Sequence, residues 1–268
     1  MFDLARFLRL ARAQWSEQRR TWLWFLGVTL ILHFVLLLID VLLSDEIGRD
    51  HSFTHAGQMG IYFLGLVVTA PVFAGRYFLA MARPESAGVL LMRPASLFEK
   101  WLLAAVVVLV AYPLAYSLLF NVLNVPMALY AQAAHEALAA SQPVDSRNAE
   151  ILGGMDYRVF LPWQAFEEDG AFATIFLMLA SAQGFAVLGS LYFRAMPFIK
   201  TVLAAFLLLL AIILSNSLVG SHGRPFLEFW GSEPLQDWRH AFLALAWFGV
   251  PGLLWLASLF ALQEREVA

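Results

Sequence analysis

Two ionisable residues stand inside the first long apolar run of the chain. His33 lies near its middle and Asp40 follows seven residues later, so the two share one face of a helix. Ionisable side chains at membrane depth are costly and mark proton or substrate pathways by default. We favour the alternative, in which a neutral His33 is bonded to a neighbouring helix and Asp40 lies near the outer interface. Gln183 and Asn216 are isolated polar groups in later runs. They are candidates for lining a pathway, and hydrogen bonds between helices explain them equally well.

Sequence patterns for hydrolytic chemistry are missing. No Gly-Lys pair occurs, so the chain has no phosphate-binding loop, and neither Gly-x-Ser-x-Gly nor His-Glu-x-x-His is present. His51 and His55 have i,i+4 spacing, but two histidines in a short loop make a weak metal site. The chain has no cysteine. We therefore predict a non-catalytic protein with no catalytic residue, metal or cofactor.

Six long apolar runs set the architecture. The composition is 61% hydrophobic and 14% charged, outside the usual range of soluble proteins. Each run has about 20 residues, the length of a helix that crosses about 30 Å of hydrocarbon. The sequence predicts an all-α, polytopic membrane protein whose residues 1–268 form a single transmembrane domain. The expected spans are Trp22–Leu43, Met59–Phe78, Trp101–Phe120, Ala171–Tyr192, Thr201–Val219 and Ala241–Leu262.

The basic residues indicate the orientation of these spans. Placing the N-terminus in the cytoplasm puts twelve of them on that side and five on the other, which follows the positive-inside rule. Both termini are then cytoplasmic. The cytoplasmic set is Arg6, Arg9, Arg12, Arg19, Arg20, Arg76, Arg83, Arg93, Lys100, Arg194, Lys200 and Arg265. The other set is Arg49, Arg147, Arg158, Arg224 and Arg239.

Three segments outside the spans have their own patterns. Residues 1–20 predict an amphipathic helix on the lipid surface, with one apolar stripe and basic residues beside it. The stripe is Leu4, Phe7, Leu8, Ala11 and Trp15. Residues 121–170 form an acidic external segment, in which we expect a helix over Pro126–Ala140 and a second, interfacial helix around Phe160, Trp163 and Phe166.

Residues 79–100, expected in the cytoplasm, are the most informative short stretch. Pro84 and Glu85 favour the start of a short helix, which ends before Pro94. Ser96 and Glu99 then have the spacing of a capping box that starts the third span. The cluster could dock a cytosolic partner, or its apolar residues could rest on lipid. Its members are Pro84, Glu85, Val89, Leu90, Leu91, Met92, Arg93, Glu99 and Lys100.

This arrangement resembles the permease subunits of bacterial type-2 ABC exporters. Their Leu-x-x-Pro-Ala-Ser-x-x-Glu-Lys motif before span three matches Leu91–Lys100. One departure is the large external segment, which follows span three here rather than span five. The resemblance implies a separate ABC ATPase that docks on the cluster, and a second permease chain, as a homodimer or heterodimer. It also implies a place in the bacterial inner membrane.

Two other classes of function compete with this one. A membrane anchor or assembly subunit would dock a partner without moving substrate. An integral membrane enzyme would need catalytic groups gathered at one membrane face, which the sequence lacks. The partners expected are an ABC ATPase, a second permease chain and lipid, with no nucleic acid.

Overall fold

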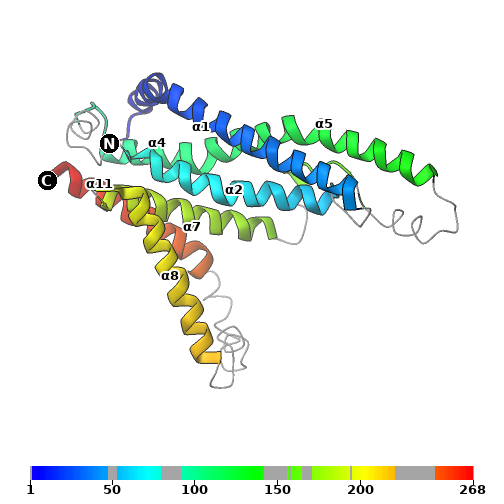
Figure 1. The fold of residues 1–268 in the computed structure, drawn as a ribbon. Coiled ribbons are helices and arrows are strands. Elements are labelled where there is room, and N and C mark those ends of the chain that lie inside the picture. Colours follow the sequence, from blue (N-terminus) through cyan, green and yellow to red (C-terminus); the bar gives the residue numbers. More distant parts are fainter. Residues whose placement is uncertain are drawn as a thin grey trace. The chain divides into compact units, whose positions relative to one another are not determined.

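The computed structural model describes residues 2–47, 53–79, 92–141, 156, 158–164, 171–193, 195–220 and 245–267. Within these ranges every regular element is a helix (Figure 1), as the sequence predicts. Five helices are long and apolar enough to cross a membrane. The last predicted span, Ala241–Leu262, coincides from residue 245 onward with helical structure, and the count of six spans stays a prediction.

The helices have the following bounds. They are α1 (Leu4–Ile47), α2 (His55–Tyr77), α4 (Leu97–Val106), α5 (Tyr112–Ser141), α7 (Ala171–Tyr192), α8 (Pro197–Gly220) and α11 (Val250–Val267). Two π-helical segments, η2 (Val107–Ala111) and η5 (Leu245–Gly249), lead into α5 and α11. Because η2 joins α4 to α5 without a break, the chain is helical from Leu97 to Ser141.

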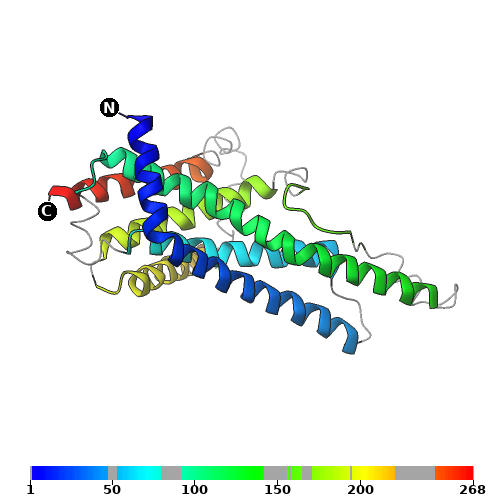
Figure 2. The same ribbon diagram turned by 90° about the horizontal axis from the view of Figure 1, so that it is seen from above.

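Helix α1 combines two elements that the sequence presented as separate. The expected surface helix over residues 1–20 and the first span form one unbroken helix of 44 residues, drawn in blue in Figure 2. A helix that crosses about 30 Å of hydrocarbon needs about 20 residues, so α1 has roughly twice as many residues as one span requires.

The expected external helix over Pro126–Ala140 is also the end of a longer helix. Pro126 lies inside α5 rather than at the start of a new element. A proline in a helix removes one N–H donor and crowds the preceding turn, but helices in membranes tolerate it where neighbours satisfy the freed groups. The helical prediction for Pro126–Ala140 is therefore confirmed, but this stretch continues α5 instead of forming a short external helix of its own.

The chain divides into two compact units, to which α1, α2 and the Leu97–Ser141 helix each contribute parts. In the first unit, residues 1–12, 71–109 and 173–268, side-chain donors join α4, α7 and α11. Trp101 Nε1 donates to Trp255 O at 2.9 Å, and Trp255 Nε1 donates to Ala180 O at 3.1 Å. Such bonds hold helices together where no hydrophobic force favours their association.

The second unit, residues 13–70 and 110–172, has an aromatic core between α1, α2 and α5. Tyr62, Tyr116 and Phe120 are each at most 2% exposed. The rings of Tyr62 and Phe120 meet edge to face, with centroids 5.1 Å apart, the arrangement that aromatic quadrupoles favour. This core is amphipathic, because each tyrosine also brings a hydroxyl that must be hydrogen-bonded.

Helix α8 turns almost all of its apolar side chains outward. Leu203, Phe206 and Leu207 are each more than half exposed, and α8 diverges from α7 in Figure 1. Contiguous exposed apolar surface of this extent marks contact with a membrane or another protein.

Close packing between α7 and α8 depends on Gly189. A Cβ at this position would lie 2.1 Å from Thr201 Oγ1 and 2.5 Å from Thr201 Cγ2. We expect Gly189→Ala to destabilise the protein by about 1–3 kcal/mol, because the two helices must separate. Gly75→Ala is the control, since its nearest neighbour, Ala186, would be 3.7 Å away. Thermal unfolding in detergent measures both, and equal melting temperatures would contradict this packing.

Candidate functional site

The Ser96–Glu99 capping box predicted from the sequence is present. Glu99 N donates to Ser96 Oγ at 3.2 Å, and Ser96 N donates to Glu99 Oε2 at 2.9 Å. The backbone of Ser96 is extended and α4 begins at Leu97. Two N–H groups that an isolated helix start would leave unpaired are therefore satisfied.

The same carboxylate also holds the start of α1. Arg6 donates to Glu99 through two nitrogens, Nε to Oε2 at 2.8 Å and Nη2 to Oε1 at 2.6 Å. Asp3 N donates to Glu99 Oε1 at 3.0 Å. Bidentate guanidinium–carboxylate pairs are both strong and geometrically specific. We call Asp3, Arg6, Ser96 and Glu99 the N-terminal corner.

Electrostatics favour a negative charge at the N-terminal corner. The first turn of a helix carries partial positive charge on its free N–H groups. Glu99 accepts N–H groups from Ser96, before α4, and from Asp3, before α1. The carboxylate is fully buried, whereas about a third of the Arg6 side chain is exposed. Glu99 therefore links two helix starts inside the chain.

The other predicted docking residues have different environments. Met92 is 87% exposed and Arg93 is half-buried, whereas Lys100 is buried. Pro84, Glu85, Val89, Leu90 and Leu91 lie outside the described residues. An exposed methionine therefore stands four residues before the anchored Ser96, and the Glu-Lys end of the motif is packed inside.

The apolar stripe predicted on the N-terminal helix is largely exposed. Leu4, Leu8 and Trp15 are each about half exposed. The buried side of the same stretch carries Leu10 and Gln14 instead. An outward apolar stripe beside exposed arginines is typical of a helix at a lipid surface.

A buried polar cluster surrounds His33 in the second unit. His33 Nδ1 lies 2.9 Å from Thr29 O, and His33 Nε2 lies 2.6 Å from Tyr116 Oη. Tyr116 Oη is also 2.8 Å from Tyr62 O. A Cβ on Gly65 would lie 2.2 Å from His33 Nε2, so only glycine leaves room for this contact. The bonded histidine considered from the sequence is therefore present.

Counting hydrogens assigns the roles in this cluster. Tyr116 Oη donates its hydrogen to Tyr62 O, and Thr29 O can only accept. The three contacts of this cluster call for three hydrogens, whereas a neutral His33 ring and the Tyr116 hydroxyl supply two.

Among the remaining predicted pathway residues, Gln183 is the one whose side chain is described, and it lies in the first unit, apart from the His33 cluster. Gln183 is 1% exposed and its Nε2 donates to Val108 O at 2.9 Å, a carbonyl in the π-helical segment η2. It therefore joins α7 to η2. Asp40 belongs to α1 and Asn216 to α8, and their side chains lie outside the description. His51 lies outside it too, and no group of three potential metal-ligating His, Cys, Asp or Glu residues occurs among the described residues.

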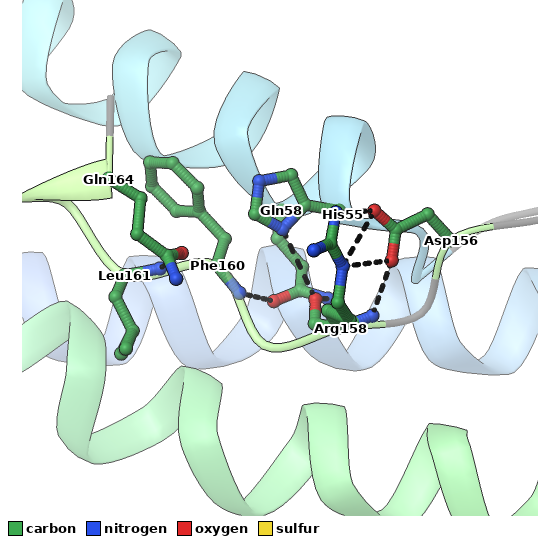
Figure 3. A network of polar contacts seen from close by, with 7 residues as sticks. All are labelled: His55, Gln58, Asp156, Arg158, Phe160, Leu161 and Gln164. Carbon is green, nitrogen blue, oxygen red and sulfur yellow. Dashed lines mark hydrogen bonds and ion pairs between the residues drawn. The ribbon is translucent and has the colours of Figure 1, made fainter. Parts of the chain in front are cut away.

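Gln58 organises a second polar cluster, which sequence reasoning missed (Figure 3). Its Oε1 accepts Asn124 Nδ2 at 2.9 Å and Phe160 N at 2.8 Å. Its Nε2 donates to Phe53 O at 2.9 Å and to Arg158 O at 3.3 Å. Gln58 and Asn124 are both fully buried. One amide therefore fixes the 158–160 backbone against α2 and α5.

These bonds overturn the interfacial helix expected around Phe160, Trp163 and Phe166. Residues 158–161 have no helical structure, residues 162 and 163 form a turn, and Gln164 has 3₁₀ geometry. The N–H of Phe160 is bound by Gln58 and its carbonyl accepts Asn124 Nδ2 at 3.2 Å. These side chains hold the backbone at Phe160 in a non-helical conformation. Phe166 itself lies outside the described residues.

An exposed ion pair borders this cluster. Asp156 accepts Arg158 Nη2 at 2.7 Å and Arg158 N at 3.0 Å. Hydrogen bonding to Arg158 lowers the pKa of Asp156 to about 2. The carboxylate therefore stays charged, and the turn keeps its bonds, as the pH falls from 7 to about 3.

Removing the Glu99 charge should release the start of α1. We expect Glu99→Gln and Arg6→Gln each to speed amide hydrogen exchange over residues 4–12 by about tenfold, because the bidentate bond is lost. Glu264→Gln, at an exposed glutamate of α11, is the control. The double variant should add little to either single one. Unchanged exchange in both single variants would show that the pair does not hold the helix.

Gln58→Leu tests the second cluster. The substitution keeps the side-chain size but leaves Phe160 N and Asn124 Nδ2 without their shared acceptor. We expect a loss of about 3–5 kcal/mol, from two or more buried groups at about 1–3 kcal/mol each. Gln164→Leu is the matched control, since Gln164 Oε1 accepts only Leu161 N within a local turn. Thermal unfolding measures this loss. The rate of thiol labelling of Val159→Cys in both backgrounds reports how firmly residues 158–160 are held. Equal losses would refute the central role of Gln58.

None of the protein-family models, curated proteins or solved structures compared with the chain matches it. The resemblance drawn from Leu91–Lys100 therefore stays a prediction.

Proposed function

We propose that this chain is the permease subunit of a bacterial type-2 ABC exporter. It forms a dimer with a second permease chain, and separate ATPase subunits supply the energy. The observation that carries the proposal is the N-terminal corner, where the motif's glutamate joins the start of α4 to the start of α1. A force applied to the segment before Ser96 would act on both helices at once.

The proposal places the N-terminal corner at the cytoplasmic surface of the inner membrane. The twelve-to-five distribution of basic residues supports this orientation. The exposed stripe of Leu4, Leu8 and Trp15 supports it as well, because exposed arginines beside it, such as Arg9 and Arg12, suit an anionic leaflet. The 97–141 helix then starts at that surface and runs through the bilayer.

Docking of the ATPase is assigned to residues 79–100. Met92 supplies an exposed apolar side chain there, and the ion pair of Glu99 fixes the point at which the segment joins the membrane helix. Apolar side chains that enter a groove on a partner, with charges at the rim, are a common mode of helix recognition. Glu99 and Lys100 act in this scheme by positioning the segment, because both are buried.

Met92→Asp tests the docking surface. We expect it to weaken assembly with the exporter's separate ATPase subunit by about 10- to 100-fold, because a carboxylate enters an apolar contact. Met196→Asp is the matched control. Met196 is 70% exposed in the connection before α8, and its φ of 50° is tolerated by aspartate. Co-purification and ATP-dependent flux in reconstituted vesicles measure the effect.

Three results would contradict the proposal. Equal assembly of both variants would remove residues 79–100 from the docking surface. Assembly without any ATP-dependent flux would favour the anchor subunit over the permease. Labelling of Met92→Cys by an impermeant reagent outside intact cells would overturn the orientation, and the absence of other cysteines makes that measurement unambiguous.

A further inference from the structure

An apolar groove of about 510 Å³ opens between α8 and the helices beside it in the first unit. Small side chains create the space, and larger apolar ones close its walls. Its lining includes Gly75 of α2, Ala182, Phe185 and Ala186 of α7, and Ala205 and Leu209 of α8. The volume lies within the range of about 300–1,000 Å³ that is usual for ligand pockets.

The three hydroxyl groups along the groove are used inside their own helices. Ser181 Oγ donates to Leu177 O at 3.0 Å, Ser190 Oγ to Val187 O at 2.7 Å, and Thr201 Oγ1 to Pro197 O at 2.7 Å. The lining therefore offers no hydroxyl hydrogen to a polar ligand. Its occupant must be apolar along the length of the groove.

The length of the groove matches one leaflet of a bilayer. On α8 it runs from Pro197 to Leu209, which is about 18 Å at 1.5 Å per residue. Half of a hydrocarbon core is about 15 Å. A groove of this length, lined by a membrane-type helix, reaches from the headgroup level to the bilayer centre.

Basic residues lie beside the end of the groove near Phe198. Lys200 stands in the first turn of α8, with its Nζ 5.9 Å from the ring centroid of Phe193. Arg265 Nη2 donates to Leu191 O at 2.7 Å, at the end of α7 beyond Ser190. Glu264 and Glu266 flank Arg265 in the sequence of α11, so Lys200 rather than Arg265 is the basic residue that an anionic group would meet. The opposite end, near Met178 and Leu209, is apolar.

We propose that this groove holds one acyl chain of a phospholipid whose anionic headgroup lies at Lys200. The chain fills the space between α7 and α8, where the protein supplies no side chain of its own. The headgroup meets a basic side chain and the positive end of the α8 dipole. This inference does not depend on the transport function, since any membrane protein with this groove would bind lipid in the same way.

The probe is a phosphatidylglycerol with a photoactivatable group in mid-chain, in nanodiscs of phosphatidylethanolamine. We expect it to label α7 and α8 at the lining residues. Ala205→Phe, which fills the groove, should lower labelling at least fivefold. Ala211→Phe, at an exposed alanine of α8 outside the lining, should leave it unchanged. Ala182→Leu fills the same space from α7, so a loss with both Ala205→Phe and Ala182→Leu is independent of damage to one helix.

Lys200→Gln tests the contribution of the headgroup to binding separately from that of the acyl chain. It should abolish the preference for phosphatidylglycerol over a phosphatidylethanolamine probe, whereas Lys200→Arg should keep it. Equal labelling in Ala205→Phe and the parent protein would overturn the proposal. Disulfide formation between two copies of Ala205→Cys in nanodiscs would also overturn it, because a second chain would then cover the groove.

Discussion

The carboxylate of Glu99 is the point on which the start of two helices depends. It accepts the N–H of Ser96 that precedes α4, the N–H of Asp3 that precedes α1, and both arms of the Arg6 fork. Without it, two helix starts would have unpaired donors and the Arg6 guanidinium would lose its bidentate bonds. The Pro-Ala-Ser-x-x-Glu pattern therefore ties the start of α4 to the start of α1.

Polar groups recur inside this apolar chain wherever helices must be fixed relative to one another. In the second unit His33 joins α1 to α5, and Gln58 joins α2 to α5 and to the 158–160 backbone. In the first unit Gln183 reaches a carbonyl of the π-helical segment η2. Apolar surfaces alone do not discriminate between registers in a lipid environment, so these bonds supply the specificity. If these residues lined a pathway, its opening would have to break these hydrogen bonds between helices and replace them with others.

The sequence was sufficient for features that depend on local pattern. Apolar length predicted the helical class, and the Ser96–Glu99 spacing predicted the capping box. It failed where long-range contacts override local signals. The aromatic spacing around Phe160 indicated a helix, whereas residues 158–161 are non-helical and the backbone of Phe160 is bound by Gln58 and Asn124. The stretch Pro126–Ala140 is helical as predicted, but no local signal showed that it continues α5. A glutamine at the edge of an apolar run was the available signal for that cluster, but its partners are 66 and 102 residues away.

The unbroken helix from Leu97 to Ser141 has a consequence for cooperativity. It contributes residues 97–109 to the first unit and residues 110–141 to the second, and the boundary falls inside the π-helical segment η2. Helix formation is cooperative along a continuous hydrogen-bonded backbone. Ordering of this helix in one unit therefore favours its ordering in the other, where a flexible loop would have left the two independent.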